Sequence, residues 1–103
     1  MNDGEMSSTA TNVIKLSPTQ ALFALMIEPF PRLSAYWNWE HRTCDTEALD
    51  DAMGIMSHGE RILAQFFLSL WTHNSRGFDM FEAASVLDQE WRQVIVDWLA
   101  DPF

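Results

Sequence analysis

The chain has 103 residues and a formal net charge of −9, because fifteen Asp and Glu residues outnumber six Lys and Arg residues. A chain of this length forms one domain, and its hydrophobic content of 48% is that of a globular protein. Six scattered basic residues cannot build the positive patch that nucleic acids and anionic membrane surfaces attract, so we expect direct binding to neither.

The cysteine content and the apolar runs indicate a cellular location. Cys44 is the single cysteine, so no internal disulfide can form, which suits a reducing compartment. No basic region leads into an apolar run near the N-terminus, and the longest apolar run, residues 21–27, is far too short to span a membrane. We therefore expect a protein of the cytoplasm of a bacterial-type cell.

The N-terminal segment differs in composition from the rest of the chain. Residues 1–16 are rich in Ser, Thr and Asn and contain no aromatic residue. Such a composition cannot bury enough apolar surface to fold, so it predicts a flexible arm. Residues 17–103 are predicted to form a single helical domain.

A first helix is predicted from residue 18 onwards. Ser17 and Gln20 can form a capping box, and Pro18 suits the first helical position. The residues that follow are apolar on nearly all sides, which predicts a central place in the core. The helix should end near Glu28, because Pro29 disfavours the helical conformation in the residue before it.

Residues 31–42 are predicted to form a second helix. Leu33, Tyr36 and Trp37 would share one face at i, i+3, i+4 spacing. Trp39 would point about 200° away from Trp37 at 3.6 residues per turn, so both rings can be buried only if this helix is sandwiched. Trp39 is therefore a candidate for exposure.

Four more helices are predicted, each after a capping residue. They cover residues 46–53, 58–72, 80–86 and 89–100, after Asp45, Ser57, Asp79 and Asp88. Gly54 should end the first of them, and Gly77, which permits a positive φ, should stop the second. No segment alternates apolar and polar residues, so we expect no sheet. The predicted fold class is all-α: a single compact bundle of five or six short helices with a flexible N-terminal arm.

The aromatic residues are predicted to lie mainly in the core. Phe66, Phe67, Trp71 and Trp98 recur at helical spacing, as burial against neighbouring helices requires. One or two of the remaining rings should lie on the surface, where aromatic side chains are favoured binding anchors.

Residues 57–100 combine an aromatic-rich helix ending in Trp, a polar turn, a Gly-aromatic-Asp step and a short acidic helix. The residues that carry this pattern are Trp71, Asn74, Gly77, Phe78, Asp79 and Asp88. In this pattern the stretch resembles small uncharacterised helical proteins of bacterial mobile elements such as plasmids and prophages. Those proteins have no established activity, so the resemblance implies a habitat and little chemistry.

Catalytic and metal-binding patterns are incomplete. His41 and Cys44 form one weak ligand pair without the second pair that zinc sites usually show. Ser57 lies beside His58 but serves as a helix cap, and nothing marks an oxyanion hole beside Cys44. The chain also lacks a phosphate-binding loop. We therefore expect no catalytic residues, no metal, no cofactor and no enzyme activity.

Trp39 is one candidate partner-binding residue, and the others are acidic residues. They fall into two sets, one near Trp39 and one near the C-terminus: Asp45, Glu47, Asp50 and Asp51, then Glu90 and Asp97. Such residues can be an ordinary solvated surface. They can also attract a basic partner, since their charge is all of one sign.

Two kinds of function remain open. The first is a non-enzymatic acidic protein-binding module, an inhibitor or adaptor from a phage or other mobile element that acts on a host protein. Its partner would be a basic or nucleic-acid-handling protein, and a sharper version is an anti-defence or anti-CRISPR-type nucleic-acid mimic. The alternative is a small structural or assembly subunit, a homodimer or larger homo-oligomer that buries Trp37, Trp39 and Phe81 between copies.

Overall fold

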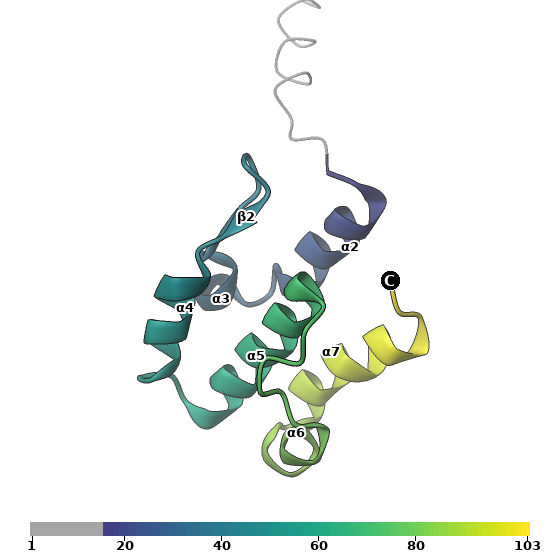
Figure 1. Ribbon diagram of the computed structural model, residues 1–103. Helices are drawn as coiled ribbons and strands as arrows, with labels where there is room; N and C mark the ends of the chain where they lie inside the picture. Colours follow the sequence, from purple (N-terminus) through teal and green to yellow (C-terminus); the bar gives the residue numbers. More distant parts are fainter. Residues whose placement is uncertain (1–15) are drawn as a thin grey trace, which may run out of the picture.

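The computed structural model describes residues 16–103 as a bundle of six helices with one short β-hairpin (Figure 1). The elements are α2 (Pro18–Ile27), α3 (Pro31–Ser34), β1 (Trp37–Asn38), β2 (Thr43–Cys44), α4 (Thr46–Met53), α5 (His58–Thr72), α6 (Met80–Val86) and α7 (Gln89–Ala100). The all-α prediction is confirmed. The predicted arm over residues 1–16 lies, apart from Leu16, outside the described residues.

The predicted helix starts are present with their capping bonds. Ser17 Oγ accepts the N–H of Gln20 at 3.1 Å, and Gln20 Oε1 accepts the N–H of Ser17 at 3.0 Å. Ser57 and Glu60 form the same reciprocal pair at the start of α5. The aspartate caps of the other helices, Asp45, Asp79 and Asp88, each accept a backbone N–H of the first turn. These bonds satisfy donors that a helix start leaves unpaired.

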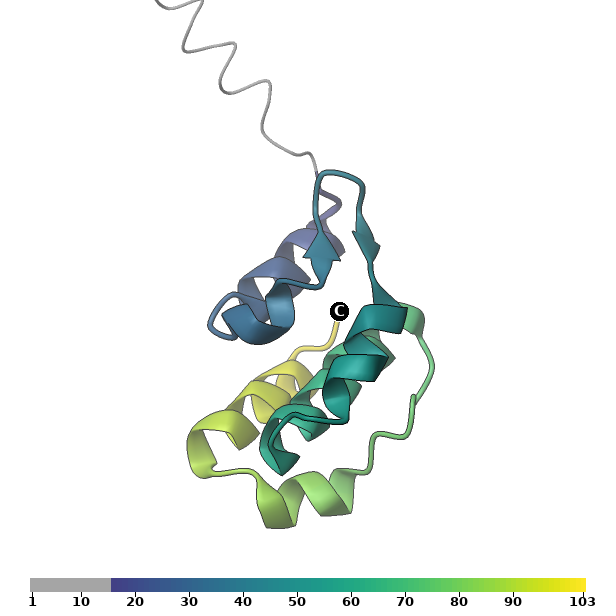
Figure 2. The ribbon, with the colours of Figure 1, turned by 90° about the vertical axis from the view of Figure 1, so that its left-hand side faces the viewer.

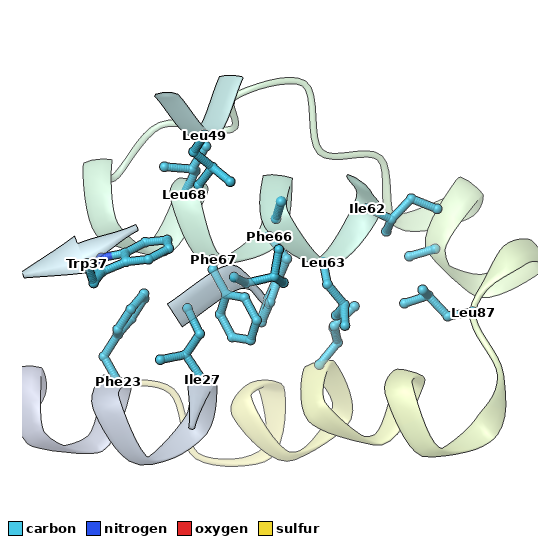
Figure 3. Close-up of a cluster of buried hydrophobic side chains, with 14 residues drawn as sticks. Phe23, Ile27, Trp37, Leu49, Ile62, Leu63, Phe66, Phe67, Leu68 and Leu87 are labelled. Carbon is cyan, nitrogen blue, oxygen red and sulfur yellow. The ribbon is translucent and has the colours of Figure 1, made fainter. Parts of the chain in front are cut away.

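Helix α5 is the centre of the bundle. Its buried residues are Ile62, Leu63, Ala64, Phe66, Phe67 and Leu68. In Figure 3, Leu68 lies near Leu49 of α4, whereas Phe67 faces α2. Helices α4 and α7 lie on opposite sides of α5 in Figure 1. Figure 2, read with Figure 1, shows the hairpin at the end of the bundle where α2 begins and α6 at the other end.

An aromatic cluster joins α2, the hairpin and α5, with Phe23 at its centre. The Phe23 ring lies within 5.3–6.0 Å, centroid to centroid, of the rings of Trp37, Trp39, Phe67 and Trp71. The tilted and edge-on angles between these rings are those that aromatic pairs prefer. The prediction that most aromatic residues serve the core is confirmed for Phe66 and Phe67, while Trp71 and Trp98 are half-buried against it.

The prediction of a helix over residues 31–42 is wrong beyond Ser34, and so is the expectation of no sheet. Helix α3 ends after one turn, and the chain then forms the antiparallel pair β1–β2, in which Trp37 is opposite Cys44 and Asn38 opposite Thr43. The N–H of His41 is bonded to Asn38 Oδ1 at 3.1 Å and closes the loop. Trp37 lies in β1 and Trp39 in the turn that follows it, and both rings pack against Phe23 in the aromatic cluster.

Two further expectations are corrected. Helix α2 is not buried on all sides, since Leu22 and Leu25 are 51% and 64% exposed. Helix α5 ends at Thr72, and His73 rather than Gly77 adopts the left-handed conformation at its end, with φ 56°. Gly77 does have the predicted positive φ, 79°, but it lies in the turn that follows.

Candidate functional site

The predicted acidic residues of α4 have unequal roles. Asp45 Oδ1 accepts the Ala48 N–H at 3.1 Å, so this carboxylate is bound to the helix start. The two carboxylate oxygens of Asp50 lie 3.1 and 3.0 Å from Nη2 of Arg76.

Glu47 and Asp51 are the two remaining carboxylates of this set. They lie one helical turn apart and are exposed, and neither has an ion-pair partner within residues 16–103. The α4 surface therefore presents two uncompensated carboxylates.

Trp39, the aromatic candidate, is not a projecting anchor. It is half-buried, and its ring lies 6.0 Å from the rings of both Phe23 and Trp71. It borders a shallow hollow between the hairpin and the start of α4, which Asp45 and Cys44 also line. Of the predicted candidates, this hollow brings together Trp39 and Asp45.

The α7 candidates form a strip. Glu90 and Asp97 are seven residues apart, which places them on one face of an α-helix, and Asp101 at the C-cap shares that face. Gln93 Nε2 donates a hydrogen bond to Asp97 Oδ1 at 2.8 Å and holds this carboxylate in place. All three carboxylates are exposed. The strip therefore runs along the whole helix.

An apolar groove lies beside this strip, between α2 and α7. Its volume is about 420 Å³, and the residues that line it are Leu22, Leu25, Met26, Pro29, Val94, Asp97, Trp98, Asp101 and Phe103. A shallower hollow continues it toward the start of α7 and is lined by Glu90, Gln93, Val94 and Asp97. Sequence reasoning missed this groove, although one signal was present: α2 carries more apolar positions than one buried stripe needs.

The two acidic sets do not form one surface. Helix α4 lies on one side of α5 and α7 on the other (Figure 1). The predicted partner-binding residues are therefore divided between an α4 surface, near Trp39, and an α7 surface, beside the groove.

The helix dipole explains some of these carboxylates but not others. Glu47 and Glu90 lie in the first turn of their helices, where negative charge is favourable. Asp51 lies in the last turn of α4, and Asp97 and Asp101 lie at the end of α7, with no basic residue in either last turn. Negative charge is unfavourable there, so local helix stability does not account for these three residues.

Cys44 has the properties of an inert thiol. It is half-buried in the hairpin, and burial, together with the nearby Asp45 carboxylate, raises the pKa of its thiol from 9.0 to about 11. The thiolate is the nucleophile, and its fraction near neutral pH is therefore small.

No cluster of ligands suited to a metal is present in the described part of the chain. Across residues 16–103, no group of three or more His, Cys, Asp or Glu side chains is placed to bind a metal ion. In the same residues no helix combines the length and the apolar character that a membrane span requires.

Comparison with known proteins yields no relative. The chain matches no protein-family model, no curated protein and no solved structure. The resemblance to proteins of mobile elements therefore stays a prediction.

Proposed function

We propose that the chain is a non-enzymatic protein-binding module that recognises a basic partner through carboxylates. In this role it is an inhibitor or adaptor that a bacterial mobile element or phage directs at a host protein in the cytoplasm. The observation that supports the proposal best is the position of Asp51, Asp97 and Asp101. These exposed carboxylates lie where their own helices disfavour negative charge. A binding role gives a reason for that cost.

The charge balance supports a basic partner. Several arginines are already bonded within the chain: Arg32 to Glu60, Arg76 to Asp50, Arg61 to the Met53 carbonyl and Arg92 to the Ala84 carbonyl. Of the carboxylates in residues 16–103, these four arginines form ion pairs with two, Glu60 and Asp50. The resulting negative field would speed encounter with a positive protein surface.

The nucleic-acid mimic is a narrower form of this proposal. A mimic needs a row of charges that a nucleic-acid channel can follow. Because α4 and α7 lie on opposite sides of α5, one channel would engage one set, and the strip Glu90–Asp97–Asp101 is the longer row. Binding of this kind would weaken steeply with salt concentration.

Charge reversal on each surface tests the proposal. The tagged chain is used to capture proteins from a bacterial lysate, which are eluted with salt. The α4 variant Glu47→Lys/Asp51→Lys and the α7 variant Asp97→Lys/Asp101→Lys are compared with Glu28→Lys/Glu40→Lys, a matched change at exposed carboxylates elsewhere. We expect a basic protein that is lost from one of the first two variants and kept by the control. Asp50 is left intact, because its ion pair with Arg76 supports the fold.

Two results would contradict the proposal. One is the absence of any basic partner at low salt. The other is a partner that all three variants retain equally, since the carboxylates would then be only a solvated surface.

Self-assembly is the second candidate function, and exposed apolar side chains support it. Phe81 is 87% exposed on α6. Of the three rings predicted for a self-interface, Trp37 is buried within the chain and Trp39 is half-buried, so Phe81 alone is fully available. Light scattering after gel filtration separates a monomer of 11.9 kDa from a dimer or larger oligomer.

A further inference from the structure

We propose that the groove between α2 and α7 is the docking site for an amphipathic helix of the partner, with apolar side chains on one face and Lys or Arg residues along its flank. This inference rests on the proposed function and specifies which surface acts and what chemistry it recognises.

The floor of the groove favours apolar side chains. Leu22 and Leu25 are 51% and 64% exposed, so covering them would remove apolar surface from water, which is favourable. Trp98 from α7 lines the same floor, and half-buried Trp residues in concave sites are common centres of binding energy. Helix recognition by an apolar groove uses anchors of this kind.

The rim of the groove selects positive charge. Asp97 and Asp101 line it, and none of the Arg residues in residues 16–103 does. Along the helix axis, Glu90 lies about 10 Å from Asp97, and Asp97 lies about 6 Å from Asp101, at 1.5 Å per residue. A partner helix that lies along α7 would match these carboxylates with bases spaced seven and four residues apart.

Other occupants fit the groove less well. A small molecule would need several convergent polar groups to orient it. Among residues 16–103 the groove offers two rim carboxylates, while the indole N–H of Trp98 is buried and out of a ligand's reach. A second copy of this chain would carry the same charge of −9 and repel the acidic rim.

The test uses a synthetic peptide as the probe. A fluorescent Leu/Lys peptide of about 18 residues, long enough to form a helix on binding, carries its leucines on one face and lysines at the spacing given above. A scrambled peptide of the same composition has the same charge but no apolar face. The affinity of each for the full chain is measured by fluorescence anisotropy in low salt.

The protein variants separate groove binding from general attraction. Leu25→Ser removes an exposed floor residue, and Asp97→Lys/Asp101→Lys reverses the rim. Their matched controls are Ile55→Ser, at a residue 90% exposed in the loop before α5, and Glu47→Lys/Asp51→Lys on the opposite side of α5. Circular dichroism checks that each variant is folded.

The expected result is a clear preference. The amphipathic peptide should bind about tenfold more tightly than the scrambled peptide, and each groove variant should weaken its binding about tenfold, which is the effect of losing one good contact. The two controls should stay within about twofold of the unchanged chain, because changes at distant sites couple weakly.

Three results would overturn the inference. If both peptides bind alike, or if the α4 control weakens binding as much as the rim variant, attraction is general and the proposed acidic module survives without this groove. If neither peptide binds at low salt, the groove proposal fails, and the capture of a basic protein from the lysate decides separately whether the acidic module stands. If the chain is a dimer that Leu25→Ser converts to a monomer, a second copy occupies the groove.

Discussion

At the scale of single residues, Cys44 yields a specific prediction of how the stability of the fold depends on pH. Burial, and then the Asp45 carboxylate, raises the pKa of this thiol to about 11 in the folded chain, compared with 9.0 when it is unperturbed. Below pH 9 the thiol is protonated in both states, so its full contribution to stability is present. Above pH 9 the unfolded chain loses this proton more readily than the folded chain, and stability therefore falls as the pH rises toward 11.

Replacing the thiol tests this prediction. Cys44→Ala should reduce the loss of stability between about pH 9 and pH 11, because the variant has no thiol to ionise. Urea denaturation at several pH values measures the difference between the two proteins, and titration of the thiolate absorbance locates the pKa directly. Parallel stability profiles, or a thiol that titrates at its ordinary value, would show that the hairpin does not protect Cys44.

The residues of the hairpin show where sequence reasoning failed. The spacing of Leu33, Tyr36 and Trp37 fits a helical face and therefore predicts a helix that would include Trp39. The strand β1 holds only Trp37 and Asn38, and β2 only Thr43 and Cys44; two residues per strand are too few to show the alternation by which a strand is recognised in a sequence. The pairing of Trp37 with Cys44 depends on contacts across a loop, which a local pattern does not contain.

At the scale of elements, helix boundaries were predictable because their causes are local. A capping box involves residues three positions apart, so both of its partners can be read from the chain, and α2 and α5 begin as predicted. The same holds for the acidic candidates on α7, whose spacing places Glu90 and Asp97 on one face. The surplus of apolar residues on α2 was visible in the sequence, but the groove itself could not be located, because that requires knowing that α2 and α7 border the same space and leave Leu22 and Leu25 uncovered.

The end of α7 yields a prediction about helix stability. Asp97→Asn and Asp101→Asn should each raise the free energy of unfolding by about 0.3–1 kcal/mol at low salt, because each removes negative charge from the negative end of the helix dipole. Asparagine keeps the side-chain oxygen that accepts the bond from Gln93. Urea denaturation measures the change, and it should shrink as salt is added.

The control for this prediction lies at the other end of the same helix. Glu90→Gln removes a carboxylate from the first turn of α7, where negative charge is favourable, and should lower stability by a similar amount. If Asp97→Asn and Asp101→Asn also lower stability, these carboxylates have structural partners, and their unfavourable position no longer supports a binding role. If they stabilise the helix but weaken peptide binding, the chain exchanges stability for function at this site.

At the scale of the whole molecule, the central position of α5 determines how the acidic surfaces of α4 and α7 are placed relative to each other. It separates α4 from α7, so the two acidic surfaces face different directions and each can be changed without touching the other (Figure 1). Changes at sites this distant, with no shared contacts, are close to additive. The charge-reversal variants of α4 and α7 are therefore independent reporters of binding, provided that α5 remains packed.

The integrity of the bundle around α5 can be tested with two phenylalanines. Phe67 is fully buried, and its ring lies 5.9 Å from the rings of both Phe23 and Phe30. Phe67→Ala should cost about 3–5 kcal/mol, a large part of the roughly 5–15 kcal/mol that stabilises a small domain. Phe81→Ala, at a ring 87% exposed, should change stability by less than about 0.5 kcal/mol.

Urea unfolding followed by two signals distinguishes a single cooperative bundle from loosely joined parts. Circular dichroism reports the helices. Tryptophan fluorescence reports the packing of Trp37, Trp39 and Trp71 around Phe23, together with that of Trp91 and Trp98 on α7. Because α5 contributes to both, the two transitions should coincide in the unchanged chain and move together in Phe67→Ala. Fluorescence that changes before the helical signal would mean that the tryptophan side chains lose their packing before the helices unfold, so that the bundle is not a single cooperative unit.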